Sequence, residues 1–346
     1  MQPICINGSA LCGNITGIER YMHEIIIRLD QLSKDSAVDI YVLYPQNRKI
    51  NLPHLSNIRL QEIPNSRDKI NIHELRRFLK KEDGIYCSLS GNMCIQMGAL
   101  ICIHDIRPWI YKGYDKFSFR LRCGLNFISS KLFAGKIITV SDTSKHEINK
   151  YLHIKESRMQ TIYNGWEHMQ NIVSDNRIFT SNPRIEQGKY YYSLSSQAPH
   201  KNFKWVVETA KNNPTVIFAA AGKRWVSDQK SEALPRNVVY LGYVTDEENK
   251  ALMENCKAFL HPAKYEGIGI PPLEAVACGA KICVSKASCL PEIFEDCAHY
   301  FDPDNYLIDL DKLLEEPICS PDKLLEKYSW DKSAKQWMDI FRVASM

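Results

Sequence analysis

Two carboxylates flank a glycine-containing turn in the second half of the chain. The segment reads YEGIGIPPLE and places Glu266 and Glu274 eight positions apart, with a helix expected from residue 273. Glycines let a ligand approach the backbone closely, and the N–H groups of a turn and of a helix N-terminus favour an anion. Each carboxylate can accept two hydrogen bonds from vicinal hydroxyls. The segment predicts a site for phosphate and sugar; alternatively, Glu266 ends a strand and Glu274 complements a helix dipole.

A lysine in the segment APHKNFKW stands between an expected strand over 190–194 and an expected helix over 203–212. A cation about 4 Å from a phosphate contributes ~4 kcal/mol at an effective dielectric of 20, and more as a leaving group gains charge. Helix N-termini disfavour cations unless an anion is present, which favours a phosphate ligand for Lys201; a solvated lysine at a helix start is the alternative. Lys223 and Arg224 in AAAGKRW are further candidates, although exposed loop charges explain them equally well.

The first half of the chain carries candidates at the ends of two expected strands. His104 and Asp105 follow the apolar run ALICI, so they fall at the carboxyl end of a strand, where a capped core histidine is the alternative. Gly13 and Gly17 in GSALCGNITGIERY permit a close approach of negative charge to the following helix. The pattern G-x-G-x-x-G is absent there, which argues against a dinucleotide fingerprint.

Apolar runs alternate with helical patterns in both halves, which predicts two doubly wound α/β lobes. We predict a first domain over 1–172, completed by a last helix over 330–346, and a second domain over 173–329, with the polar stretch 174–188 as a linker. Ligands of such folds bind at the carboxyl ends of the strands, so a central cleft between the lobes is expected.

Composition excludes several classes of protein. The chain has 346 residues and a net charge of +4, which does not favour a nucleic-acid binder. Its twelve cysteines contain no C-x-x-C pair, so they read as buried small side chains rather than zinc or redox ligands. No window supplies the ~20 apolar residues of a membrane span and no leader is visible, so we expect a cytoplasmic protein. The DPD triplet at 302–304 falls in a late turn, and neither a metal nor a cofactor is predicted.

The run HPAKYEGIGIPPLEAVACGAKICVSKASCLPE resembles the hallmark segment of family 4 of the retaining nucleotide-sugar glycosyltransferases, which have the GT-B fold. The resemblance extends over nearly the whole chain, and a thirty-residue match in order is far more specific than a lone glycine motif. It implies two Rossmann-like domains facing a central cleft, an acceptor-binding first domain and a nucleotide-sugar-binding second domain. It also implies that Glu266 contacts the donor sugar, that Glu274 binds the ribose, and that the backbone of Gly267, Ile268 and Gly269 lies against sugar and phosphate.

The same resemblance implies roles for residues outside the turn. Lys201 would neutralise the donor diphosphate, and His104, with Asp105 beside it, would contact the donor sugar. The glycine loop of the first half would lie near the phosphates and the acceptor. Many relatives carry Arg where this chain has Ser195, so Lys201, the turn amides and Lys223 or Arg224 would share the diphosphate. The residues implied to line the base pocket are Gly242, Tyr243 and Val244.

The resemblance implies a retaining, metal-independent transferase that uses a nucleotide diphosphate sugar as co-substrate. TGIERY and HDIRPW are similar to bacterial enzymes that add rhamnose, mannose or related hexoses to a glycan or lipid-linked acceptor in O-antigen or capsule biosynthesis. The alternatives are a nucleotide-sugar epimerase or hydrolase, and a non-catalytic sugar-nucleotide-binding protein. The basic, aromatic segment 117–133, with Arg120 and Arg122, either contacts the inner face of an anionic membrane or packs against the first sheet.

Overall fold

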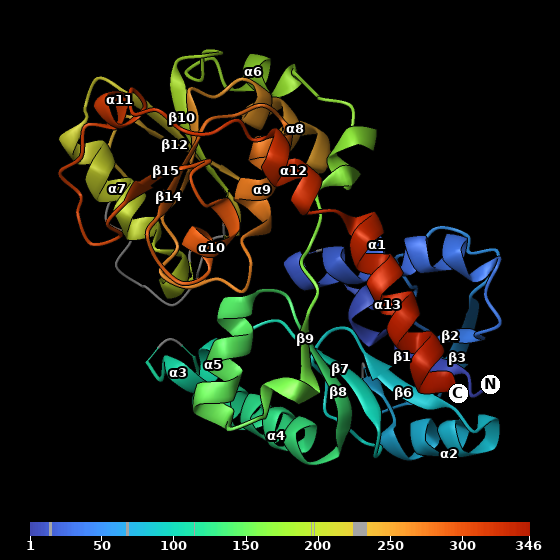
Figure 1. The fold of residues 1–346 in the computed structure, drawn as a ribbon. Helices are drawn as coiled ribbons and strands as arrows, with labels where there is room; N and C mark the ends of the chain where they lie inside the picture. The colour runs from blue at the N-terminus through green and yellow to red at the C-terminus, as the bar shows by residue number, and fades with distance from the viewer. Residues whose placement is uncertain (14–15, 67–68, 114, 195, 197, 224–233) are drawn as a thin grey trace. The chain divides into compact units, whose positions relative to one another are not determined.

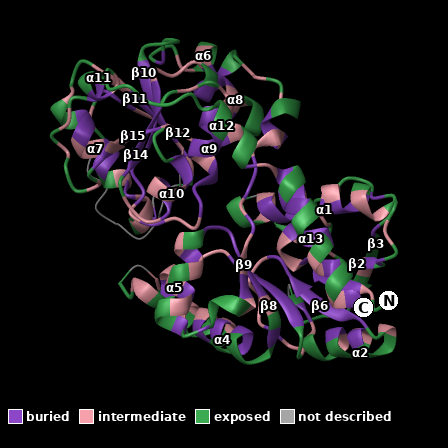
Figure 2. Cartoon of the chain, in the orientation of Figure 1, coloured by how far each residue is buried: buried purple, intermediate pink, exposed green. Residues whose placement is uncertain are grey.

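The computed structural model describes residues 1–13, 16–66, 69–113, 115–194, 196, 198–223 and 234–346 (Figure 1). The chain divides into two compact units, each built on a parallel sheet of its own. The first unit comprises Met1–Asn164 and Ser329–Met346, and the second comprises Gly165–Tyr328. The central strands of both sheets are deeply buried (Figure 2), as expected for parallel sheets that helices cover on both faces.

The first unit has a seven-stranded parallel sheet in the order β3-β2-β1-β6-β7-β8-β9. One core cluster joins this sheet to side chains of α2, α4 and α5, among them Leu75, Phe127 and Ile148. Its strands are β1 (Ile4–Asn7), β2 (Ile40–Pro45), β3 (Arg59–Ile63), β6 (Ile85–Ser88), β7 (Ala99–Ile103), β8 (Ala134–Thr139) and β9 (Met159–Thr161), beside a hairpin of β4 (Asn65–Ser66) and β5 (Lys69–Ile70). Its α-helices are α1 (Gly17–Ser33), α2 (Ile72–Glu82), α3 (Arg107–Ile110), α4 (Phe117–Phe133), α5 (Asp142–Leu152) and α13 (Trp330–Ser345), with 3-10 turns η1 (Ser9–Cys12) and η2 (Glu156–Arg158).

The second unit has a six-stranded parallel sheet in the order β12-β11-β10-β13-β14-β15. Its core stacks Trp205 on Phe301, with ring centroids 4.1 Å apart. Its strands are β10 (Tyr190–Leu194), β11 (Ile217–Ala221), β12 (Val238–Gly242), β13 (Ala258–His261), β14 (Ile282–Ser285) and β15 (His299–Phe301). Its helices are α6 (Arg177–Ser181), α7 (Phe203–Asn212), α8 (Asp246–Glu254), α9 (Ile270–Ala277), α10 (Leu290–Phe294), α11 (Leu310–Leu313) and α12 (Asp322–Lys327), with 3-10 turns η3 (Glu167–Asn171) and η4 (Pro199–Lys201).

The last helix returns to the first unit, as the sequence predicts. Helix α13 packs along α1 (Figure 1), and Trp337 donates from Nε1 to the Tyr21 hydroxyl at 2.7 Å. Trp337 and Phe341 are fully buried on this face, so the helix is part of the first unit's core.

The prediction of a linker over 174–188 is wrong. This stretch contains α6, buries Ile178 and Ile185, and joins α8 through a bond from Asp175 N–H to the Glu247 carbonyl at 3.0 Å. The units divide between residues 164 and 165, whereas the predicted boundary follows residue 172. Trp166 explains the difference, because its Nε1 donates to the Leu325 carbonyl at 2.8 Å within the second unit. A short exposed helix has the same polar composition as a linker.

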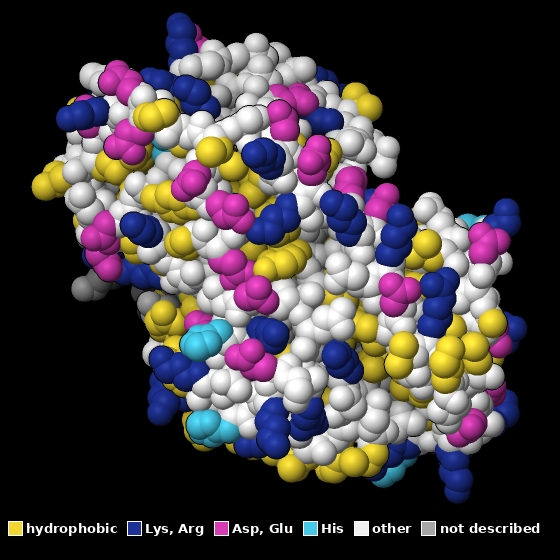
Figure 3. All heavy atoms as spheres, viewed as in Figure 1, with side chains coloured by type: hydrophobic (Ala, Val, Ile, Leu, Met, Phe, Trp, Pro, Cys, Tyr) yellow, Lys and Arg dark blue, Asp and Glu magenta, His cyan; other side chains and the backbone are white. Residues whose placement is uncertain are grey.

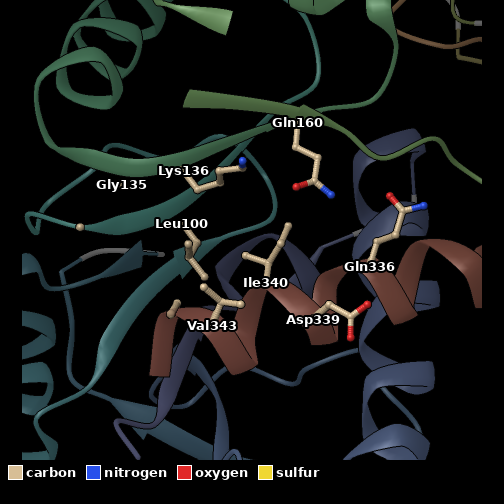
Figure 4. Close-up of a pocket in the computed structure, with 10 residues that line it drawn as sticks. Leu100, Gly135, Lys136, Gln160, Gln336, Asp339, Ile340 and Val343 are labelled. Atoms are coloured by element: carbon tan, nitrogen blue, oxygen red, sulfur yellow. The ribbon is translucent and has the colours of Figure 1, made fainter. Parts of the chain in front are cut away.

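A pocket of about 500 Å³ opens in the first unit at the amino-terminal side of β7 and β8, against α13 (Figure 4). Leu100, Lys136, Ile340 and Val343 contribute to its lining. The predicted site residues follow the carboxyl ends of strands, so this pocket lies at the opposite edge of the sheet and is not the candidate site.

Candidate active site

The second sheet has a topological switch point at β10. This strand pairs with β11 on one side and with β13 on the other, so the connections run to opposite sides of it. Lys201 follows β10 and Glu266 follows β13, which places both at the carboxyl ends of adjacent strands. Open α/β sheets bind their ligands at such a point.

Lys201 and Glu266 meet there and form one buried cluster with a histidine. Lys201 donates from Nζ to Glu266 Oε1 at 2.6 Å, and the last residue of β13, His261, donates from Nε2 to the same oxygen at 2.9 Å. The carboxylate side chain is 11% exposed and the ammonium side chain 21%, so most of the cluster is shielded from solvent. Both hydrogen bonds fall on Oε1, and the other carboxylate oxygen, Oε2, can accept from a ligand.

The cluster fixes the charge of Glu266. Burial acts to raise the pKa of this carboxyl, but the Lys201 ammonium and the hydrogen bond from His261 hold the pKa well below its usual range. Glu266 is therefore an anion at neutral pH. Lys201 has three N–H donors, so it can keep this bond and still donate to a phosphate oxygen.

Neighbouring loops hold both partners in place. Asn202, which follows Lys201 with a φ of 57°, donates from Nδ2 to the carbonyls of Pro262 and Pro303 at 3.1 and 2.9 Å. Ser288 donates from Oγ to the Glu266 carbonyl at 2.9 Å. These bonds between neighbouring loops hold the backbone at Lys201 and Glu266 in place. The loops therefore help to fix the distance between the ammonium and the carboxylate.

The turn between the two carboxylates needs its second glycine. Gly269 has a φ of +84°, and a Cβ there would lie 2.9 Å from Leu290 Cδ2. Ile268 is buried, so only its backbone faces a ligand.

Helix α9 begins at Ile270, earlier than the expected residue 273, and continues with two prolines. Since Pro271 and Pro272 have no N–H, this helix offers fewer donors to an anion than most helix N-termini do. The amides of Gly267, Ile268 and Gly269 become the main backbone donors of the turn.

Glu274 lies in α9, and its partner is a second histidine. His168 of η3 donates from Nε2 to Glu274 Oε1 at 2.9 Å, and both residues are buried. Within the part of the chain that the structure describes, no lysine or arginine lies at salt-bridge distance from this carboxylate. The two acids of the turn therefore have different electrostatic partners.

The remaining candidates of the second unit follow the neighbouring strands. Lys223 is exposed after β11, and Gly242, with a φ of +70°, ends β12. Tyr243 is 86% exposed, whereas Val244 is buried. These residues lie at the same sheet edge as Lys201. Arg224 and Ser195 lie outside the described residues.

In the first unit, His104 and Asp105 follow β7 and are held by local bonds. His104 Nε2 donates to the Leu89 carbonyl at 2.8 Å, and Asp105 Oδ1 accepts from the Arg107 N–H at 2.8 Å. Burial lowers the pKa of His104, while the Cys102 thiol, the Leu89 carbonyl and Asp105 raise it, with a net rise to about 9. Through its bond to the Arg107 N–H, Asp105 stabilises the start of α3.

The two candidate glycines flank the start of α1. Gly13 accepts at its carbonyl from Asn51 Nδ2 at 2.6 Å, and Gly17 is the first residue of α1. The helix is capped by Thr16 together with Glu19. Glu19 thus has a structural partner beside this loop.

The two histidines that bond the carboxylates, His261 and His168, are not predicted from the sequence. His261 lies inside the recognised run and ends an apolar strand, which is the pattern that marks His104. His168 offers no such signal, because its contact with Glu274 spans more than a hundred positions. Among the described residues, no group of three His, Cys, Asp or Glu side chains is arranged to hold a metal ion. None of the described helices combines the length and the apolar content of a membrane span.

Comparison with known proteins agrees with this geometry. Residues 174–329, which include every candidate of the second unit, match the model of the family "Glycosyl transferases group 1". The chain is 25% identical over 233 residues to the O-antigen chain mannosyltransferase RfbU of Salmonella typhimurium, covering 64% of this chain and 61% of that protein. It is 26% identical over 223 residues to O-antigen chain mannosyltransferase B of Escherichia coli, covering 60% and 58%. The matches thus span about 60% of the length of these relatives.

Solved structures share the fold over the full length of both chains. Sucrose-phosphate synthase from Thermosynechococcus elongatus superposes with a TM-score of 0.76 at 13% identity, covering 99% of this chain and 98% of that one. Anabaena HepE, in complex with UDP and glucose, gives a TM-score of 0.70 at 14% identity and covers 99% of each chain. Residues 174–329 are thus similar to the group 1 glycosyl transferases, and the two units of the chain have the GT-B fold.

Proposed function

We propose that this protein is a retaining glycosyltransferase that moves a hexose or 6-deoxyhexose, of mannose or rhamnose type, from a nucleoside diphosphate. The acceptor is a glycan or a lipid-linked oligosaccharide of a bacterial surface polysaccharide. The observation that carries the proposal is the cluster of Lys201, Glu266 and His261 beside the glycine turn at the switch point. Mannose is the first candidate because two relatives are named O-antigen mannosyltransferases.

The cluster supports a division of labour at the donor. Lys201 stabilises the negative charge that develops on the departing diphosphate, together with the amides of Gly267 to Gly269. Glu266 accepts from the sugar hydroxyls through Oε2 while Oε1 stays bonded to the cation. Glu274 accepts from the ribose. This ammonium and these amides supply positive charge without a metal, which supports a metal-independent reaction.

The reaction breaks the bond between sugar C1 and the phosphate oxygen and forms a bond between C1 and the acceptor oxygen. The acceptor proton passes to the departing diphosphate, which is a sufficient base once it leaves. Retention follows if the acceptor attacks from the face that the phosphate leaves. We assign the second unit to the nucleotide sugar and the first unit, with His104, to the acceptor and the transferred sugar.

The first test is a thermal-shift panel of nucleotide sugars that carry mannose, rhamnose and glucose. A ligand at 100 times its dissociation constant adds ~2.7 kcal/mol of stability, which is easily measured. The donor that gives the largest shift is then incubated with the protein, with and without acceptor glycans, and release of nucleoside diphosphate is followed.

Transfer predicts release only with acceptor, and NMR of the product gives the anomeric configuration. Rapid turnover without acceptor would indicate the nucleotide-sugar hydrolase or epimerase class instead. Donor binding without product from any acceptor would indicate a sugar-nucleotide-binding protein. No shift with any nucleotide sugar would overturn the proposal.

A further inference from the structure

Helix α4 of the first unit buries two serines and exposes several of its large apolar residues. Its buried positions include Ser129 and Ser130, whereas Phe117 is 74% exposed and Leu132 is 58% exposed. An exposed apolar patch of this size is informative, because water-soluble helices normally bury this face. Helix α13 follows the usual rule, since it buries Trp337 and Phe341.

Five exposed apolar residues of α4 form one continuous stripe. With 3.6 residues per turn they fall within an arc of about 80° along a helix of about 25 Å. We call this set the α4 stripe: Phe117, Leu121, Leu125, Ile128 and Leu132. Trp109 extends it, because its ring lies over Gly124, where an added Cβ would be 3.2 Å from the ring, and it is itself 40% exposed.

Polar contacts on the buried face of α4 hold the helix in its present rotation. Ser129 accepts at Oγ from the Cys94 N–H at 3.0 Å, and Asn126 donates from Nδ2 to the Gly91 carbonyl at 3.1 Å. Phe127 supplies the apolar contact with the core cluster. These bonds fix the rotation of the helix, so the stripe is a permanent feature of the surface.

Basic side chains border the stripe. Residues 107–133 contain six basic residues and one acidic residue, and that acid, Asp115, is ion-paired with Arg107 at 2.5 Å. The excess of positive charge in this segment alone exceeds the net charge of +4 of the whole chain. Arg122 and Lys131 are exposed on either side of the stripe. Figure 3 shows yellow side chains along the lower edge of the molecule, where Figure 1 draws α4, with dark blue side chains beside them.

We infer that α4 docks this protein on an anionic lipid bilayer, with the α4 stripe and Trp109 inserted at the headgroup level. An apolar face bordered by cations is the composition of a helix that lies in the membrane interface. Trp109 is suited to this depth because its ring has both an apolar body and a polar N–H. A second copy of the chain is a poorer occupant, since a symmetric contact through this face would bring the two basic borders together.

The test is flotation with vesicles of phosphatidylcholine alone and with one third phosphatidylglycerol, using the full chain without donor or acceptor. We expect binding to the anionic vesicles and weak binding to the neutral ones. The stripe variant Leu121→Ser, Leu125→Ser, Ile128→Ser should lower the partition coefficient at least about tenfold. The charge variant Arg122→Gln, Lys131→Gln should lose the preference for anionic lipid and the sensitivity to salt.

A matched control removes three exposed apolar side chains elsewhere, Val173→Ser, Leu307→Ser and Val343→Ser, and should float like the original protein. Thermal unfolding verifies that all variants fold. The inference is overturned if the unaltered protein binds neither vesicle, or if the stripe variant binds as well as the control. It is also overturned if sedimentation shows a dimer that only the stripe variant abolishes. The assay contains no nucleotide sugar, so its failure is independent of the proposed transferase activity.

Discussion

The two carboxylates of the glycine turn look alike in sequence and differ in surroundings. Glu266 and Glu274 are both nearly buried, and each accepts a hydrogen bond from a histidine Nε2 at 2.9 Å. Only Glu266 also binds an ammonium group, because Lys201 shares its Oε1. The first acid belongs to a charged cluster at the sheet edge, and the second is bonded to a single histidine.

This difference predicts that the two acids affect different steps, the chemical step for Glu266 and donor binding for Glu274. On the proposed function, a change at Glu266 or Lys201 disturbs the charge that faces the departing phosphate, so it acts on the transition state. A change at Glu274 disturbs a contact that, on the proposed function, the bound donor makes equally in the ground state, so it acts on binding. Variants at the two ends of the turn should therefore fall into different kinetic classes.

The largest effect is expected from Lys201→Ala. Without the ammonium, the reaction loses its strongest stabilisation of the leaving diphosphate, so kcat should fall about 1000-fold. The buried Glu266 carboxylate also loses its cation, which should cost about 2–3 kcal/mol of unfolding free energy. Transfer assays and urea unfolding at pH 7 measure the two losses.

The double variant Lys201→Ala, Glu266→Gln controls for the lost stability. Replacing the stranded carboxylate with an amide should recover most of the unfolding free energy but none of the activity. If the double variant regained transfer, or if Lys201→Ala kept a normal rate, Lys201 would not be the diphosphate ligand.

The second prediction contrasts the two acids directly. Glu266→Gln should lower kcat about 100-fold, because the neutral amide weakens both the bond to Lys201 and the bonds to the sugar hydroxyls. Glu274→Gln should leave kcat within about twofold and raise the KM for the donor about tenfold. Steady-state kinetics with the donor found by thermal shift gives both values. Equal losses of kcat in the two variants would remove the distinction between them.

The turn that joins the acids provides the third prediction. Gly269→Ala places a Cβ at a φ of +84° and 2.9 Å from Leu290 Cδ2, so it should cost about 2 kcal/mol and displace the amides of the turn. Gly279→Ala is the matched control, since its φ is +79° but no heavy atom of the described residues lies within 4 Å of the added Cβ. The control should lose about 1 kcal/mol and no activity; equal effects on transfer would count against the turn as a ligand site.

His261 provides a fourth prediction, on the positioning of Glu266. His261→Phe keeps the ring in its buried place beside Phe259 but removes the donor to Glu266, so kcat should fall about tenfold. His261→Gln retains an N–H donor and should recover part of this loss, with an unchanged KM for the donor. A purely structural role would instead give equal losses in both variants, in proportion to their melting temperatures.

The sequence predicts the parts of this site that depend on local pattern. The alternation of apolar runs predicts the two sheets, and the spacing of the turn predicts Glu266, Glu274 and the amides between them as site residues. Lys201 is predicted from its position at a strand end, and the structure brings it to Glu266 because β10 and β13 are neighbours. The recognised run therefore carries most of the site.

The missing parts depend on contacts between distant positions. His168 reaches Glu274 only after the chain folds back on α9, and no pattern near residue 168 indicates this. The polar stretch 174–188 resembles a linker because its few buried residues, Ile178 and Ile185, are too widely spaced to show a period. Likewise, helix α4 is predicted as a helix, but which of its faces is buried is decided by the loop that bonds Asn126 and Ser129.

The last prediction, with the smallest expected effect, concerns how the free energy of unfolding depends on acidic pH through Glu266. In the unfolded chain the Glu266 carboxyl titrates near 4.5, and in the folded protein Lys201 and His261 hold its pKa well below that value, against the effect of burial. The stabilisation from this difference is complete above pH 4.5 and is lost as the pH falls below it, by at most about 1.4 kcal/mol per pH unit. We therefore expect the original protein to lose unfolding free energy relative to Glu266→Gln as the pH falls from 5 to 3. Other carboxyls with a lowered pKa, such as Asp30 and Asp175, are present in both proteins and cancel.

Urea unfolding at each pH measures the difference, with Gly279→Ala as a control whose difference from the original protein stays constant. A difference for Glu266→Gln that is equally constant would show that the cluster does not hold a charged Glu266, and the contrast between the two acids would then have no electrostatic basis.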